Sequence, residues 1–103
     1  MSIVTLQSAR ANSASLVTLL KEKGASHISF RDDSSQFYDK PAQGEYYLID
    51  VYMPKGVGGY CYEVNKNGKV SFSGSLRNNS LEFEKGNTMF IGIIEKWVVN
   101  KKE

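Results

Sequence analysis

The sequence contains very little of the chemistry that most catalytic and metal-binding sites use. It has a single cysteine, Cys61, and a single histidine, His27, among 103 residues. One cysteine allows no disulfide within the chain, and one sulfur with one imidazole is too few for the usual zinc ligand sets. A serine or cysteine nucleophile would depend on His27 alone, and no spacing in the sequence indicates such a pairing. We therefore predict no catalytic residue, no metal site and no cofactor, and we expect that the chain is not an enzyme.

Long apolar runs and a strong net charge are also missing. No stretch approaches the roughly 18 apolar residues of a membrane-spanning helix, so we expect no membrane association. The N-terminus lacks a basic segment followed by an apolar one, which is the pattern of a signal peptide, and a lone thiol suits a reducing compartment. We therefore expect a cytoplasmic location. The net charge of +2 is too small to demand a polyanionic partner.

The patterns that are present are typical of one domain that covers residues 1–103. Apolar side chains recur at helical spacing over 13–23 and again over 88–100, which predicts a helix near each end of the chain. We expect the first helix to be capped by Asn12 or Ser13 and to end at Gly24, and the second to be capped by Asn87 or Thr88. Residues 2–7 fit either a short strand or the start of a helix.

Alternating apolar and polar residues predict strands over 26–31, 45–53 and 80–84, with a turn at 85–86 after the last of these. Both faces of the segment 45–53 are largely apolar, which indicates a strand in the middle of the sheet. A hairpin follows it. A three-residue loop, 66–68, with Gly68 in a left-handed conformation would place Val64 opposite Val70 and Tyr62 opposite Phe72. A two-residue loop would instead place Lys66 opposite Lys69, which is unfavourable.

These elements predict an α+β fold, a two-layer sandwich in which a mainly antiparallel sheet of four to five strands carries an N-terminal and a C-terminal helix on one face. The opposite face of the sheet would then lack a cover of helices. On the strand 45–53 that face holds two tyrosines and a leucine around one aspartate: Tyr46, Leu48, Asp50 and Tyr52. Exposed tyrosines are frequent in protein interfaces, so this face is the candidate binding surface.

The long polar segment 32–44 adds two more aromatic candidates, Phe37 and Tyr38, among several acidic residues. Loops of this length in small domains are uncommon and are often functional. The segment can border the tyrosine-bearing face and take part in binding, or it can fold back and cover Tyr46 and Tyr52. The sequence leaves both arrangements open.

Asp50 stands out because aspartate is disfavoured in the middle of a strand. If it is buried, its charge must be paired or its pKa must rise. It could anchor a cation of a binding partner, or it could accept a hydrogen bond from a neighbouring hydroxyl or backbone group. We favour the internal hydrogen bond, because buried polar groups are normally satisfied within the protein.

The leading hypothesis for function is a small non-catalytic protein-binding domain, such as an inhibitor, an immunity-type protein, an adaptor or a regulatory accessory subunit. It would dock through the tyrosine-bearing face and the acidic loop 32–44 onto another protein or a second copy of itself. The alternative is a domain that binds single-stranded nucleic acid, with strand tyrosines stacking on bases and the basic residues Lys55, Lys66, Lys69 and Arg77 along the backbone. An enzyme or small-ligand binder that uses Asp50 and tyrosines in a pocket ranks third, because no activated nucleophile or base is identifiable.

Overall fold

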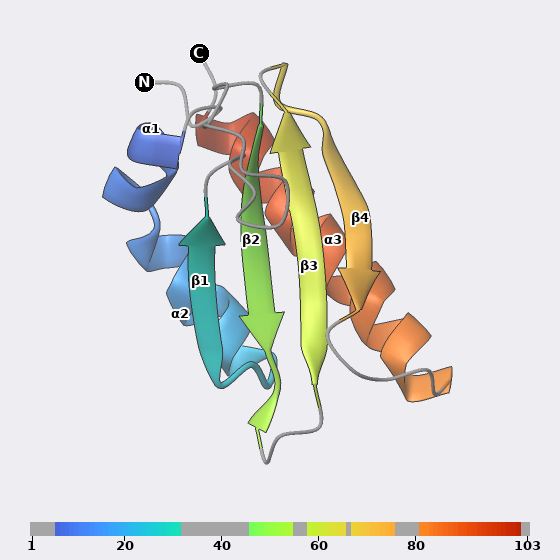
Figure 1. Cartoon of the computed structure of the whole chain (residues 1–103). Helices are drawn as coiled ribbons and strands as arrows, with labels where there is room; N and C mark the ends of the chain where they lie inside the picture. Colours follow the sequence, from blue (N-terminus) through green and yellow to red (C-terminus); the bar gives the residue numbers. More distant parts are fainter. Residues whose placement is uncertain (1–5, 32–45, 55–57, 66, 76–80, 102–103) are drawn as a thin grey trace.

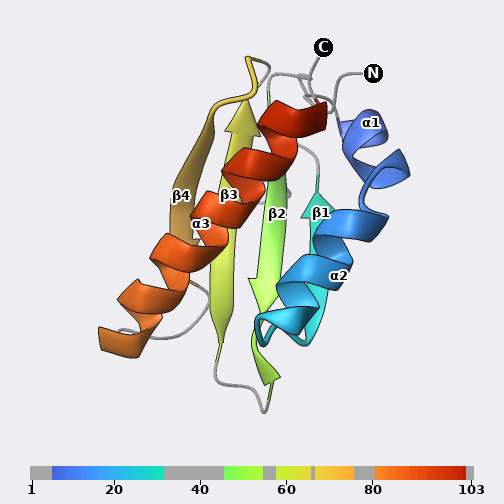
Figure 2. The same cartoon turned by 180° about the vertical axis from the view of Figure 1, so that it is seen from behind.

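A computed structural model of the chain describes residues 6–31, 46–54, 58–65, 67–75 and 81–101 (Figure 1). The elements follow one another in the order α1 (Leu6–Ala11), α2 (Ala14–Glu22), β1 (His27–Arg31), β2 (Tyr46–Tyr52), β3 (Gly59–Asn65), β4 (Val70–Ser75) and α3 (Leu81–Lys101). The four strands form one antiparallel sheet in the order β1-β2-β3-β4. Figure 1 shows the helices behind this sheet and Figure 2 shows them in front of it, so they lie on the same side. The predicted α+β class, with a helix toward each end of the chain, is confirmed.

The core lies between the helices and the face of the sheet that they cover. Strand alternation directs every second side chain of the sheet toward the helices. The buried cluster therefore joins strand residues with helix residues: Ile28, Tyr47, Ile49, Val51, Tyr60, Tyr62 and Val64 with Leu16, Leu20, Phe90, Ile94, Trp97 and Val98. β2 is an inner strand, as its largely apolar faces predict.

The β3–β4 hairpin has the predicted register. Val64 lies opposite Val70 and Tyr62 opposite Phe72. The amide of Asn65 donates to the carbonyl of Lys69 over 3.0 Å, which closes the three-residue loop 66–68. Gly68 has a φ of 84°, in the left-handed region that favours glycine. The cross-strand pairs and the turn chemistry therefore agree on one register.

The N-terminal helix begins where the sequence predicts, but its cap is different. Ser13 precedes α2 in a right-handed helical conformation and makes no side-chain bond to a helix amide. Its hydroxyl donates instead to the carbonyl of Arg10 over 3.0 Å, because α1 ends just before it. At the other end, Gly24 has the expected positive φ, 111°. Of the ambiguous segment 2–7, the described part, from Leu6 on, is helical, while residues 2–5 and the loop 32–44 lie outside the described residues.

The predicted strand 80–84 and the turn that follows it are wrong. The described part of that segment, from Leu81, is already the first turn of α3, and the helix continues through Gly86. A four-residue alternation is too short to distinguish a strand from a helix that contains leucine, glutamate and lysine, which are good helix formers. The predicted cap residue Asn87 lies inside the helix, where its side-chain oxygen accepts a hydrogen bond of 2.8 Å from the hydroxyl of Tyr62.

Gly86 has a packing role rather than a turn role. A Cβ atom at this position would overlap the hydroxyl of Tyr60 and lie 3.1 Å from its Cζ. The ring of Tyr60 is held between Phe90, at a centroid distance of 5.3 Å, and Tyr62, at 6.2 Å. The missing side chain therefore lets α3 approach the sheet closely at this point.

Candidate functional site

The side of the sheet opposite the helices carries the candidate surface. Among the described residues, no helix lies on that side (Figures 1 and 2). We call this side the open face. Its side chains on the first three strands are His27, Ser29, Arg31, Tyr46, Leu48, Asp50, Tyr52, Cys61, Glu63 and Asn65.

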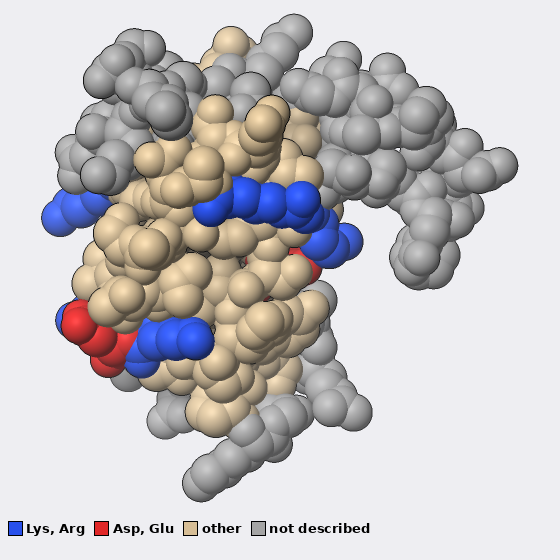
Figure 3. Space-filling model, turned by 90° about the vertical axis from the view of Figure 1, so that its left-hand side faces the viewer, with Lys and Arg blue, Asp and Glu red and all other residues tan. Residues whose placement is uncertain are grey.

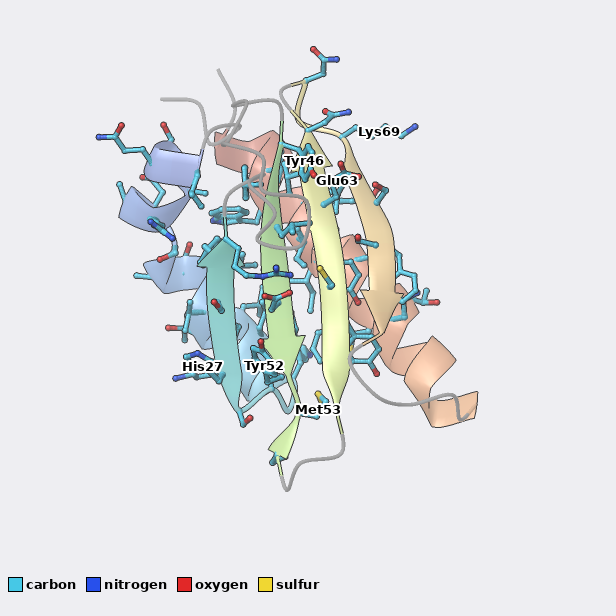
Figure 4. All side chains as sticks on the ribbon, viewed as in Figure 1. His27, Tyr46, Tyr52, Met53, Glu63 and Lys69 are labelled. Atoms are coloured by element: carbon cyan, nitrogen blue, oxygen red, sulfur yellow. The ribbon has the colours of Figure 1, made fainter. Side chains whose placement is uncertain are left out.

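The two tyrosines of the open face are far apart. Figure 4 shows Tyr46 and Tyr52 at opposite ends of β2. Six residues separate them, which at about 3.3 Å per residue is roughly 20 Å along the strand. Tyr52 is 37% exposed, and Tyr46 and Leu48 are half-buried. Neither tyrosine ring belongs to the buried core.

Asp50, between the two tyrosines, is held by an arginine of the neighbouring strand. Its relative exposure is 1%. Nη2 of Arg31 donates to one carboxylate oxygen over 3.0 Å, and Nε donates to the other. The two-pronged contact satisfies a carboxylate that could not remain buried as an unpaired charge. Asp50 is therefore paired within the chain, as we favoured, but by a guanidinium rather than by a hydroxyl or backbone group.

Cys61 completes this polar centre. It lies directly opposite Asp50 on β3, is 8% exposed, and its Sγ accepts a contact of 3.5 Å from Nη2 of Arg31. Burial, together with the hydrogen bond and the charge of Asp50, raises the pKa of the thiol to about 11. Asp50 in turn raises the pKa of Arg31 above its ordinary value, through the hydrogen bond first. At neutral pH the group is therefore an ion pair beside a protonated thiol, which is a poor nucleophile.

An aromatic pair lies at one end of the open face. The rings of His27 and Tyr52 are stacked, with centroids 5.7 Å apart and planes inclined by 29° (Figure 4). His27 is exposed, as the strand alternation predicts. Two neighbouring rings with access to solvent form an apolar surface with polar edges, the chemistry that protein interfaces favour.

Basic side chains flank the open face on the β1 side. Figure 3 views the molecule from this side and shows lysine and arginine spread over it. Nη2 of Arg10 donates to the carbonyl of Phe30 over 2.9 Å and so fixes one exposed guanidinium at the β1 edge. Lys21 and Lys23 are also exposed, with Glu22 between them in sequence. Of the two carboxylates that the described strands place on the open face, Asp50 is buried and paired with Arg31, and Glu63 is half-buried.

The structure brings together only some of the predicted site residues. Tyr46, Leu48, Asp50 and Tyr52 share one face, as predicted, while Phe37 and Tyr38 lie outside the described residues. The sequence reading did not assign Arg31 or Cys61 to the site, nor His27. Alternation was a usable signal for Arg31, because it places this residue on the same face as Asp50, and opposite charges on one sheet face tend to pair.

Comparison with protein-family models, curated proteins and solved structures finds no match for this chain. None of the helices in the described part of the chain is both long and apolar enough to cross a membrane. Within the same described residues, no group of three or more histidine, cysteine, aspartate or glutamate side chains is placed to hold a metal ion. The open face is therefore the feature of this chain from which a function can be inferred.

Proposed function

We propose that this chain is a small non-catalytic protein-binding domain that docks on its partner through the open face. The observation that carries the proposal is the exposure of Tyr52, stacked on His27, on a sheet side without a described helix. The proposed class includes inhibitors, immunity-type proteins, adaptors and regulatory accessory subunits. The acidic loop 32–44, with Phe37 and Tyr38, is included in the proposed docking surface on the basis of the sequence alone.

The size of the surface supports a protein partner over a small ligand. Tyr46 and Tyr52 are separated by roughly 20 Å, whereas small ligands are held in enclosed pockets. A standard protein interface buries about 800 Å² on each partner. A patch of this area on the open face is wide enough to include the rings of both Tyr46 and Tyr52. Between them β2 is paired on both sides, with β1 and β3, so little ordering of this strand is required when a partner binds.

The chemistry at the centre of the face supports a binding role rather than a catalytic one. The one thiol on the face is buried and has a raised pKa, and the carboxylate beside it is already bound by Arg31. A free cysteine also suits a reducing compartment, and we propose that the domain acts in the cytoplasm.

The test is a capture experiment with matched baits. Wild-type, Tyr46→Ala, Tyr52→Ala and Leu19→Ala chains are immobilised and exposed to lysate of the source cell, and retained proteins are quantified. Leu19 is the control, because it is an exposed apolar residue, 39% exposed, on helix α2. We expect at least one protein to bind wild-type and Leu19→Ala baits and to be lost from both tyrosine variants, with the thermal stability of each bait unchanged. A set of retained proteins that is the same for all four baits would refute the proposal.

Single-stranded nucleic acid is the second candidate, because the exposed Tyr52 and His27 rings could stack on bases on the side of the molecule that carries Arg10, Lys21 and Lys23. The residues Lys55, Lys66 and Arg77 that the sequence suggests for the nucleic-acid backbone lie outside the described residues. Fluorescence anisotropy with a mixed-sequence oligonucleotide separates the candidates. Affinity that falls steeply as salt rises and is lost in Tyr52→Ala would support nucleic acid, since phosphate contacts depend on ionic strength.

A further inference from the structure

The two edges of the sheet are protected to different degrees. An edge strand presents unpaired backbone groups that can pair with another chain, and proteins usually block them with charges, proline or covering elements. At the β1 edge, the guanidinium of Arg10 binds the carbonyl of Phe30, and α1 and α2 both pack against the strand. β1 also ends in a charged residue, Arg31.

At the β4 edge, α3 packs against the strand, but the strand itself is uncharged. β4 is the outermost strand on its side, and its sequence from Val70 to Ser75 contains no charged residue and no proline. Phe72, in the middle of this strand, is 40% exposed although it points to the helix side and contacts the ring of Tyr62. Glu63 lies opposite Ser71 on the neighbouring strand β3. Lys69 directly precedes β4, and Figure 4 shows its side chain extending away from the sheet past β4.

The ladder between β3 and β4 is regular at the start of β4 and irregular later. Tyr62 pairs with Phe72, but Cys61 pairs with Gly74, so Ser73 is an additional residue on β4. A bulge of this kind disturbs the line of outward backbone groups beside it. The segment that remains suited to regular pairing is therefore the one centred on Ser71.

We propose that two copies of this chain pair antiparallel along β4, about a two-fold axis at Ser71. In this register Val70 of one copy faces Phe72 of the other, an aromatic and β-branched pair, and Lys69 faces Ser73. No like charges oppose each other, and the exposed ring of Phe72 gains an apolar neighbour. The pairing is isologous and closes after two copies.

The position of α3 fits the same two-fold axis. Figure 1 shows that this helix begins beyond the outer edge of β4, near the end of the strand. The two-fold axis places the first turn of α3 of the second copy near the start of β4 of the first copy. This contact lies on the helix side of the sheet, where Phe72 is exposed. All helices then lie on one side of an extended sheet, and both open faces lie on the other. The dimer therefore uses a surface separate from the proposed binding face and does not depend on the proposed function.

The test is sedimentation equilibrium of the full chain over concentrations of roughly 10 µM to 1 mM. We expect a reversible monomer–dimer equilibrium in wild type. Ser73→Lys should weaken the dimer at least about tenfold, because it places two lysines opposite each other, and Ser73→Glu should strengthen it at low salt by facing Lys69. Both variants remove the hydrogen bond between Ser73 and Cys61, so the loss of that bond cannot explain opposite shifts.

Tyr52→Ala is the control on the open face and should leave the dimer unchanged. A wild-type chain that remains monomeric at about 1 mM would overturn the proposal. So would a dimer that responds equally to both Ser73 variants, or one that is lost in Tyr52→Ala, since the open face would then be the contact.

Discussion

At the scale of single residues, the Arg31–Asp50 pair explains how an aspartate survives in the middle of a sheet. The carboxylate is almost fully buried, whereas half of the arginine side chain is exposed. Removing the arginine would leave a buried charge without a partner. The resulting loss of stability is larger than the loss caused by breaking an ion pair on the surface.

We therefore expect Arg31→Gln to lower the free energy of unfolding by roughly 2 kcal/mol, measured by urea denaturation. Arg10→Gln is the matched control, because Arg10 is exposed and binds a carbonyl rather than a charge. Its effect should remain within roughly 0.5 kcal/mol. Equal effects of the two variants would show that the pair does not stabilise the fold.

The thiol of Cys61 makes stability depend on alkaline pH. Its pKa is raised from 9.0 to about 11 by burial first and by Asp50 second. Between these values the unfolded chain has lost the proton while the folded chain retains it. The contribution of Cys61 is therefore fully present below pH 9.0 and is lost as the pH rises through about 11.

We expect wild type to lose roughly 1 to 2 kcal/mol more than Cys61→Ala between these two pH values. Urea denaturation of both chains at matched pH provides the measurement. Tyr47 also has a pKa raised by burial, and its contribution is common to both chains and cancels in the difference. The pKa of Tyr62 is raised by burial first and to a lesser extent by Tyr60 and Cys61, so only its burial part cancels. Parallel pH profiles of the two chains would contradict this assignment.

At the scale of elements, the sequence predicted the features that are determined by residues close together in the chain. The register of the β3–β4 hairpin followed from turn geometry and from keeping like charges apart, both of which are local. The helix around Phe90 and Trp97 followed from the spacing of its apolar residues. By contrast, the segment from Leu81 to Gly86 is helical where the sequence predicts a strand and a turn, because its alternation is too short to separate the two states and its glycine contacts Tyr60, a residue far away in sequence, rather than forming a turn.

The same limit applies to the candidate site. Strand alternation placed Tyr46, Leu48, Asp50 and Tyr52 on one face, because side-chain direction in a strand has a period of two. It also indicated that Asp50 needs a partner. The identity of that partner depends on the register between β1 and β2, and the long segment between these strands leaves their register open from sequence alone.

The glycines of α3 allow a direct test of the packing argument. Gly86→Ala should lower the free energy of unfolding by about 1 kcal/mol despite the higher helix propensity of alanine, because the new methyl group overlaps Tyr60. Gly92 has nothing within 4 Å of its ideal Cβ position, so Gly92→Ala should raise stability by up to about 1 kcal/mol. Thermal or urea denaturation would measure both. A stabilising Gly86→Ala would show that Tyr60 moves freely.

At the scale of the whole molecule, the last described helix, α3, packs against residues from the first third of the chain. The indole nitrogen of Trp97 donates to the carbonyl of Asn12 over 3.3 Å, and its ring lies 6.3 Å from that of Phe30. α3 thereby contacts both the helical segment at the start of the chain and the first strand. One buried cluster contains residues of every helix and strand.

This arrangement predicts a single cooperative unfolding transition. Trp97 is the only tryptophan, so its fluorescence reports the contact between α3 and the N-terminal half. We expect the urea transitions followed by tryptophan fluorescence and by far-ultraviolet circular dichroism to coincide. Separate midpoints would mean that α3 detaches before the sheet unfolds.

The order of elements also has a consequence for synthesis of the protein. Each strand pairs with its neighbour in sequence, and α3 is the last of the described elements to be synthesised, so the strands can begin to pair before α3 is able to pack against them. The 21 residues of α3 take roughly one to four seconds to translate. During that interval the rings of Tyr47, Tyr60 and Tyr62 lack the cover of Phe90 and Ile94, and we expect holding chaperones to act at this stage.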